Sequence, residues 1–185
     1  MRVPQTGDMI VRSHDLDTQT LARLLLAIRA ARPAMTLRAR AIVEAILLSH
    51  GSIGSAESVA RTLGFANRFR LARFLHGEGL PPLHRLTEWV TVFSWTVSAE
   101  LHNVSLCWIA FRSHRHPSAC YRLVKKVTGC GWEEVHANGS GWVLRVFLQE
   151  LRNGARWTPT GTRFALASPP SYPRTQRATR PLKMS

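Results

Sequence analysis

Hydrophobic residues recur at helical spacing along most of this chain of 185 residues. Leu21, Leu24, Leu25 and Ile28, for example, follow the spacing i, i+3, i+4, i+7, which places them on one face of a helix. The same kind of pattern predicts helices over residues 15–32, 37–50, 56–63, 68–76, 84–102, 104–112 and 117–128, a short helix from Trp132, and a helix around 144–151. Only residues 163–167 alternate in the manner of a strand. The expected fold class is therefore all-α.

Runs of glycine, proline and serine divide these helices into groups. Pro33 ends the first helix, and HGSIGS (residues 50–55), GEGLPP (77–82) and HANGSG (136–141) separate the later ones. From Ser168 the chain is rich in proline, arginine and serine, a composition typical of a disordered basic tail. We therefore expect an N-terminal helical extension (1–36), a first unit (37–83), a connecting helix (84–103), a second unit (104–138), a C-terminal helical extension (139–167) and the tail (168–185).

The two units contain the same motif. VARTLGFANRFRLARFLH (residues 59–76) aligns with IAFRSHRHPSACYRLVK (residues 109–125) if the turn of the second copy is one residue shorter. In each copy a helix leads through a tight turn into a second helix, with Asn67 as a favourable N-cap in one and Pro117 at the first helical position in the other. The aligned pairs in the second helices are Leu71 with Cys120, Phe74 with Leu123, Leu75 with Val124, Arg73 with Arg122, and His76 with Lys125. Two helix-turn-helix units are the arrangement that this repeat predicts.

The charge of the chain indicates a polyanionic partner. Lys and Arg together number 25 against 11 Asp and Glu, a formal net charge of +14. Three of these cations are lysines, so 22 are arginines, whose planar guanidinium binds phosphate and guanine through two hydrogen bonds. A GC-rich coding bias is the alternative explanation for the arginine excess.

The repeat also resembles a known family. VARTLGF with LARFL, a long connecting helix, and then IAFR and HPSACYRLVKKVTG are similar to the tandem helix-turn-helix domain of AraC-type transcription regulators. The most specific part is Pro117–Gly129, and the similarity covers about Leu37–Val135. His114 stands where that family usually has a glycine in the second turn.

The resemblance implies that this protein binds double-stranded DNA in a sequence-specific manner, with RNA polymerase as a second candidate partner and no cofactor. In such a domain the second helix of each unit enters the major groove, here about residues 68–76 and 117–127. The side chains expected to face bases are Arg68, Phe69, Arg70, Arg73, His76, Ser118, Ala119 and Arg122. Those expected to contact phosphates are Arg61, Arg112, His116, Lys125 and Lys126.

The connecting helix allows a geometric test of this interpretation. Residues 84–101 span about 27 Å at ~1.5 Å per residue. Helices held apart by such a rod can reach successive major grooves roughly 34 Å apart, so we expect a monomer to contact two adjacent grooves. The aromatic and aliphatic residues of the connecting helix, Trp89, Val92, Phe93 and Trp95, are expected to pack against both units.

Other functions have less support in the sequence. The 11 carboxylates are scattered, so neither a metal-dependent nuclease nor another enzyme is expected. Cys107, Cys120 and Cys130 lack metal-ligand spacing and are expected to be reduced structural thiols, with no metal bound. No signal peptide or membrane span is evident, so we expect a cytoplasmic, nucleoid-associated protein without membrane contact. The alternative function is a basic helical module that binds nucleic acid non-specifically or docks a protein partner through residues 144–151.

Overall fold

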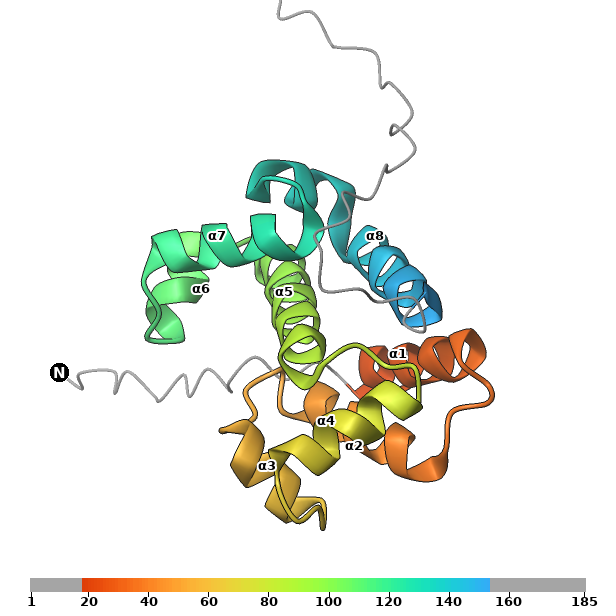
Figure 1. Ribbon diagram of the computed structural model, residues 1–185. Coiled ribbons are helices and arrows are strands. Elements are labelled where there is room, and N and C mark those ends of the chain that lie inside the picture. Colours follow the sequence, from red (N-terminus) through yellow and green to blue (C-terminus); the bar gives the residue numbers. More distant parts are fainter. Residues whose placement is uncertain (1–17, 154–185) are drawn as a thin grey trace, which may run out of the picture.

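The computed structural model describes residues 18–153, which form α-helices and no strands, so the expected all-α class is confirmed for this part of the chain (Figure 1). The helices are α1 (Thr18–Ala31), α2 (Leu37–Leu48), α3 (Ala56–Thr62), α4 (Arg68–Gly77), α5 (Leu83–His102), α6 (Leu106–Arg112), α7 (Pro117–Thr128) and α8 (Trp132–Asn153). The expected helix start at 15–17, the strand-like residues 163–167, the rest of the C-terminal extension and the basic tail lie outside the described residues.

Capping explains where the helices differ from the expected boundaries. α6 begins at Leu106 rather than 104 because Ser105 is its N-cap, and the Ser105 hydroxyl accepts a hydrogen bond from the Trp108 N–H at 3.2 Å. α2 ends at Leu48 rather than 50 because His50 has the left-handed conformation (φ 51°) and the Gly51 N–H closes the last turn on the Ile46 carbonyl at 2.9 Å.

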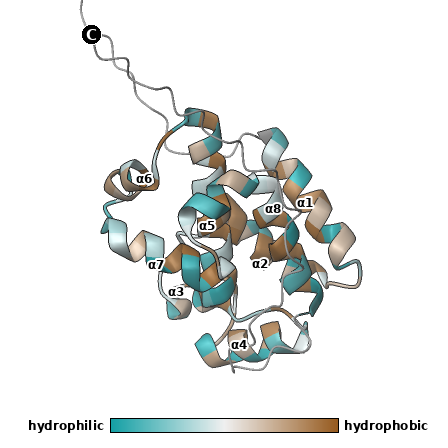
Figure 2. Ribbon diagram, turned by 90° about the horizontal axis from the view of Figure 1, so that it is seen from above, coloured by the Kyte–Doolittle hydropathy of each residue, from teal (hydrophilic) through white to brown (hydrophobic). Residues whose placement is uncertain are grey.

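α5 is the central helix of the fold. Twelve of its 20 residues are buried, and it packs against α2, α6, α7 and α8. Trp89, Val92, Phe93 and Trp95 are all buried. Trp89 stacks on Phe147 of α8, which lies outside the two units against which these residues were expected to pack. The most hydrophobic residues gather where α5 meets α2 and α8 (Figure 2). Every helix contributes buried side chains to one continuous core. α1 covers one side of this core by packing on α2 and α8.

α8 bends at the boundary that HANGSG predicted. Gly139 interrupts the helix with non-helical angles (φ 79°, ψ 171°). Glu100, near the end of α5, accepts a hydrogen bond from the Ser140 N–H at 2.6 Å and a second one from the Ser140 hydroxyl. A Cβ at position 139 would lie 2.6 Å from the Glu100 carboxylate, so only glycine fits there. The carboxylate thereby caps the second half of α8 and fixes its direction.

Candidate nucleic-acid interface

The first helix pair, α3 with α4, and the second helix pair, α6 with α7, begin with the same hydrogen bonds. In both pairs a serine hydroxyl caps the first helix, and a backbone bond closes the turn after it. The bonds are Ser58 N–H to Ser55 Oγ (3.1 Å) and Phe65 N–H to Ala60 O (2.8 Å) in the first pair, and Trp108 N–H to Ser105 Oγ (3.2 Å) and Arg115 N–H to Ala110 O (2.9 Å) in the second. The repeat in the sequence is therefore also a repeat in structure through this part of each pair.

The turn of each helix pair contains one residue in the left-handed conformation. Gly64 has φ 72° and His114 has φ 52° at the corresponding place. Histidine is one of the few non-glycine residues found there with any frequency, although its Cβ still costs about 1–2 kcal/mol relative to a right-handed conformation. His114, where the sequence departs from the AraC-type pattern, thus keeps the conformation that glycine has in the first pair.

Replacing His114 by glycine should make the protein more stable. We expect His114→Gly to raise the free energy of unfolding by about 0.5–1 kcal/mol, because the relief of the left-handed strain exceeds the entropic cost of glycine. Urea denaturation measures the change. Gly64→Ala is the matched control: its new Cβ lies no closer than 3.7 Å to another group, so it should lose about 1 kcal/mol from backbone strain alone. A loss of stability in His114→Gly would contradict the turn conformation described here.

The second helix of each pair begins directly after a residue whose side chain caps it. Asn67 caps α4 by accepting from the Arg70 N–H at 3.0 Å, and His116 caps α7 by accepting from the Ser118 N–H at 3.3 Å. Asn67 is the third residue after Gly64 along the chain, and His116 is the second after His114. The second turn is therefore one residue shorter, as the alignment requires.

A carboxylate holds the first helix pair together where the second pair needs none. The Glu57 carboxylate of α3 accepts a hydrogen bond from the Arg68 N–H, the first backbone donor of α4, at 3.2 Å. In the second pair the corresponding helix start is Pro117, which has no N–H to donate. Cys107 occupies the place of Glu57 there, and its sulfur lies 3.6 Å from the Tyr121 hydroxyl. The aligned residues thus make different contacts: Glu57 bonds to the first residue of α4, whereas Cys107 lies against the second turn of α7.

The buried sides of α4 and α7 match as the alignment predicts. Leu71 and Leu75 of α4 are buried, as are Cys120 and Val124 of α7. The third aligned pair, Phe74 and Leu123, is half-buried and packs against the same core. Because the buried positions coincide, the remaining faces of the two helices coincide as well.

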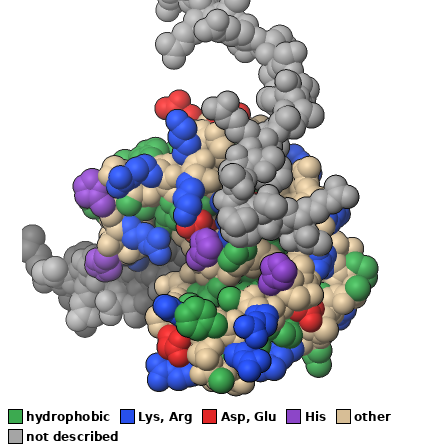
Figure 3. Space-filling model, viewed as in Figure 1, with side chains coloured by type: hydrophobic (Ala, Val, Ile, Leu, Met, Phe, Trp, Pro, Cys, Tyr) green, Lys and Arg blue, Asp and Glu red, His purple; other side chains and the backbone are tan. Residues whose placement is uncertain are grey.

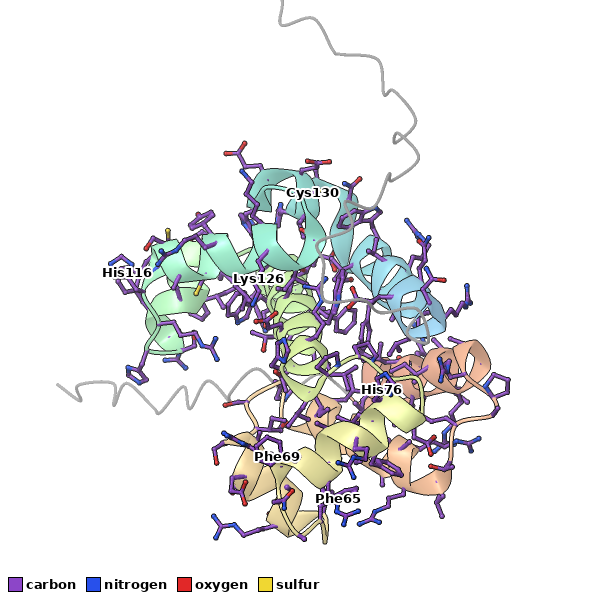
Figure 4. All side chains as sticks on the ribbon, in the orientation of Figure 1. Phe65, Phe69, His76, His116, Lys126 and Cys130 are labelled. Atoms are coloured by element: carbon purple, nitrogen blue, oxygen red, sulfur yellow. The ribbon has the colours of Figure 1, made fainter. Side chains whose placement is uncertain are left out.

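Every side chain that the sequence assigned to DNA contact is exposed. α4 contributes five of them, α7 contributes five, and His116, Arg61 and Arg112 adjoin these helices. The exposed candidates are Arg61, Arg68, Phe69, Arg70, Arg73, His76, Arg112, His116, Ser118, Ala119, Arg122, Lys125 and Lys126. In Figure 4 the labelled side chains of Phe69 and His76 lie along α4, while those of His116 and Lys126 lie at opposite ends of α7.

The cations of α4 are available for a ligand. Within residues 18–153, the side chains of Arg70, Arg73 and His76 form no hydrogen bond or ion pair. Arg68 lies over the ring of Phe69 at 4.9 Å, and that residue is 66% exposed. α4 therefore presents positive charge together with one apolar surface.

Several candidates on α7 already have partners within the protein. The imidazole of His116 bonds to the Ser118 hydroxyl at 2.8 Å, and the Arg122 Nε–H donates to the Ser118 carbonyl at 3.3 Å. Lys126 forms an ion pair with Glu88 of α5. Lys125 has no such partner in the part of the chain that the structure describes. Lys126 is accordingly a weaker candidate for phosphate contact than the sequence suggested.

Two further arginines lie beside the turns of the two helix pairs but were not assigned from the sequence. Arg38 of α2 donates to the Leu63 carbonyl at 2.9 Å and stacks 3.9 Å from the centre of the Phe65 ring, which fixes the turn between α3 and α4. Arg115 is exposed in the turn between α6 and α7 and lies over Trp95 at 5.6 Å. The signal for Arg115 was its place in the turn directly before α7.

Both basic helices face the same way. In Figure 1 α7 passes in front of α5 and α6, and α4 passes in front of α2; Figure 2 also places α4 and α7 on this side of α5. The space-filling view shows more Lys and Arg than Asp and Glu over these two helices (Figure 3). We call the exposed residues of α4 and α7 on this side the basic face. A single extended polyanion could contact both helices at once.

Neither the buried thiols nor the cavity described below contributes to the basic face. Burial raises the pKa of the Cys120 thiol and, with the neighbouring Glu134, raises the pKa of Cys130 to about 11, so both stay protonated at neutral pH. No group of three or more possible metal ligands occurs within residues 18–153. The cavity between α1, α5 and α8, about 270 Å³ in volume, has no wall from α4 or α7.

Comparisons with protein-family models, curated proteins and solved structures find no match for this chain. None of the helices between residues 18 and 153 has both the length and the apolar character that crossing a membrane requires.

Proposed function

We propose that this protein is a sequence-specific regulator of transcription that binds double-stranded DNA through two helix-turn-helix units. α4 and α7 are the recognition helices in this proposal, and each enters one of two adjacent major grooves. The role is non-catalytic and needs no cofactor. In this proposal the protein is cytoplasmic and associated with the nucleoid, and RNA polymerase is a second candidate partner.

The observation that carries the proposal is the structural repeat. Two helix pairs share N-caps, turn closure and buried positions, and both expose a basic second helix on the same side of α5. A solvated basic helix can arise once without a ligand, but such a face has no structural reason to recur in the same register. The resemblance of residues 37–135 to AraC-type regulators, which rests on the same repeat, agrees with this proposal.

The length of α5 is compatible with two grooves. Its 20 residues extend about 30 Å at ~1.5 Å per residue, close to the roughly 34 Å repeat of B-DNA. α4 precedes α5 in the chain, and the last turn of α7 packs against the first turns of α5 through Arg85 and Glu88. The support for a monomer that spans two successive grooves is therefore the pair of basic helices on one side of α5, not the length of α5 alone.

Selection of bound sequences from random duplex DNA tests the function. We expect enrichment of a preferred sequence with two short specified blocks about one helical turn apart. Equal affinity for every duplex at physiological salt would contradict the proposal and support the alternative of a basic module without sequence preference. Protection of a single block that requires a protein dimer would contradict the two-groove monomer.

Arg73 and Arg122 are expected to read bases, because they occupy the same exposed position in the two repeats. Arg73→Ala or Arg122→Ala should lower affinity for the preferred duplex by about 1–3 kcal/mol and relax selectivity at one base pair. Binding to single-base-changed duplexes measures both effects. Arg61→Ala is the matched control, since an exposed arginine on α3 should contact phosphate, weaken all duplexes alike and reduce the salt slope by about one. Equal losses on all duplexes for Arg73→Ala and Arg122→Ala would remove the base-reading assignment.

A further inference from the structure

The last turn of α8 is tied to the C-terminal ends of both basic helices. Two arginines make the connections, Arg85 from the first turn of α5 and Arg32 from the residue after α1. On α8 they bind adjacent residues, Glu150 through its side chain and Leu151 through its carbonyl. Within residues 18–153, α8 is the one element that both arginines bind, and each arginine also binds the end of one basic helix.

Arg85 joins α8 to the end of α7. Its guanidinium holds the Glu150 carboxylate through two bonds, Nε–H to Oε1 at 2.8 Å and Nη2–H to Oε2 at 2.9 Å. Nη2 also donates to the Val127 carbonyl in the last turn of α7 at 3.1 Å. The Trp89 indole N–H donates a further bond to Glu150 at 2.7 Å. Three helices, α5, α7 and α8, thus meet at one glutamate that is only 4% exposed.

Arg32 makes the matching connection to the end of α4. Its Nη1–H donates to the Leu151 carbonyl at 3.0 Å and to the Gly79 carbonyl at 3.2 Å, and Nη2–H donates to the Glu78 carbonyl. Glu78 is the C-cap of α4. The carbonyls at the end of a helix lack partners within the helix, and a guanidinium satisfies them with fixed geometry.

These contacts bear on the distance between the two DNA-binding helices. α4 is separated from α5 by the loop 78–82, so α5 alone does not fix the direction of α4. A guanidinium that forms several hydrogen bonds at once, to a buried carboxylate or to helix-end carbonyls, restricts the relative geometry of the elements it joins. α8 is therefore linked to the ends of both α4 and α7, through Arg32 and Arg85, and these links favour one relative position of the two helices.

We propose that Glu150 is a positioning residue that sets the base-pair spacing this protein accepts between its two half-sites. It acts through Arg85 on α7, while Arg32 fixes α4 on the next residue of the same turn of α8. This inference rests on the proposed function. It adds that spacing is specified by residues far from the bases, in a helix that contacts no DNA.

The test measures affinity against spacing. Duplexes carry the two selected half-sites separated by the natural number of base pairs, or by one or two more or fewer, and a further duplex carries one half-site. Wild-type protein should prefer one spacing by about tenfold or more, because rigidly joined sites bind cooperatively only when the geometry matches. Glu150→Gln should reduce that preference to within about threefold while leaving single half-site affinity unchanged.

A second variant and a control keep the result interpretable. Arg32→Lys removes the fork at α4 and should relax spacing in the same way, so the proposal does not depend on one buried substitution. Glu44→Gln breaks the ion pair with Arg29 between α1 and α2, which touches neither basic helix, and should leave spacing unchanged. Circular dichroism confirms that each variant is folded at the temperature used.

The outcomes separate this inference from the proposed function. An unchanged spacing preference in folded Glu150→Gln or Arg32→Lys would overturn the inference, as would equal losses on one-site and two-site duplexes. Wild-type protein that tolerates all spacings equally would overturn it without any variant. Failure of wild-type protein to prefer any sequence would instead reject the proposed function, and this inference with it.

Discussion

Raising the salt concentration from 50 to 200 mM should weaken binding to the preferred duplex by about 10³–10⁵-fold. The reason is the release of counterions from the phosphates that the protein neutralises, with about 6–10 phosphate contacts expected from two basic helices and their flanking arginines. The net charge of +14 and the unpartnered cations of α4 motivate the estimate. Fluorescence anisotropy with a labelled duplex across a salt series measures the slope.

The same series on an unrelated duplex serves as the control for specificity. Non-specific binding should show a similar slope with a lower affinity throughout, because phosphate contacts dominate both and base contacts are added only on the preferred site. A flat dependence on salt would mean that the basic face does not contact the phosphate backbone. That result would contradict the proposed interface even if some duplex binding remained.

Gly51→Ala should lower the free energy of unfolding by about 2–5 kcal/mol, because overpacking and left-handed strain act together. Gly51 has φ 75°, and a Cβ there would collide with the Thr91 hydroxyl and lie 2.5 Å from the Thr87 carbonyl oxygen. The loop after α2 thus touches α5 at a point where no side chain fits. Urea denaturation followed by circular dichroism gives the change in stability.

Gly77→Ala is the matched control for Gly51→Ala. Gly77 lies at the end of α4, and the Cβ of an alanine there would have no neighbouring atom within 4 Å. The substitution should therefore be neutral or stabilise the protein by up to about 1 kcal/mol. Comparable losses in both variants would contradict this explanation, because the alanine at position 77 meets no neighbouring atom and its effect on the unfolded chain is stabilising. That outcome would remove the close approach as the cause.

The sequence predicted α4 and α7 because their burial is one-sided. Leu71 and Cys120 face the core at the same step of a repeated pattern, and such periodicity survives in the sequence whatever the partner helix is. The break at Gly139 was visible for the same reason, since glycine and serine interrupt a pattern that resumes at Leu144. Local rules were sufficient wherever the determining contacts lie within one helix or one turn.

The sequence could not show which cations are already occupied. Arg32 and Arg85 bind carbonyl groups at the ends of other helices, and Arg38 binds the turn after α3. Their partners lie 25 to 119 residues away in the chain, so no local pattern marks them. Counting all arginines as available for DNA overstates the basic face, because part of the positive charge holds the fold together.

The ion pair between Glu88 and Lys126 has a consequence for discrimination among duplexes. Glu88 lies on α5 beside the last turn of α7, with its side chain 18% exposed, while Lys126 is 60% exposed. On the proposed interface a phosphate that approaches Lys126 must compete with a carboxylate that is already there. The chain would therefore carry its own anionic competitor at one edge of the proposed interface. Such a competitor penalises loosely docked encounters, whereas a matched site offsets the penalty through its base contacts.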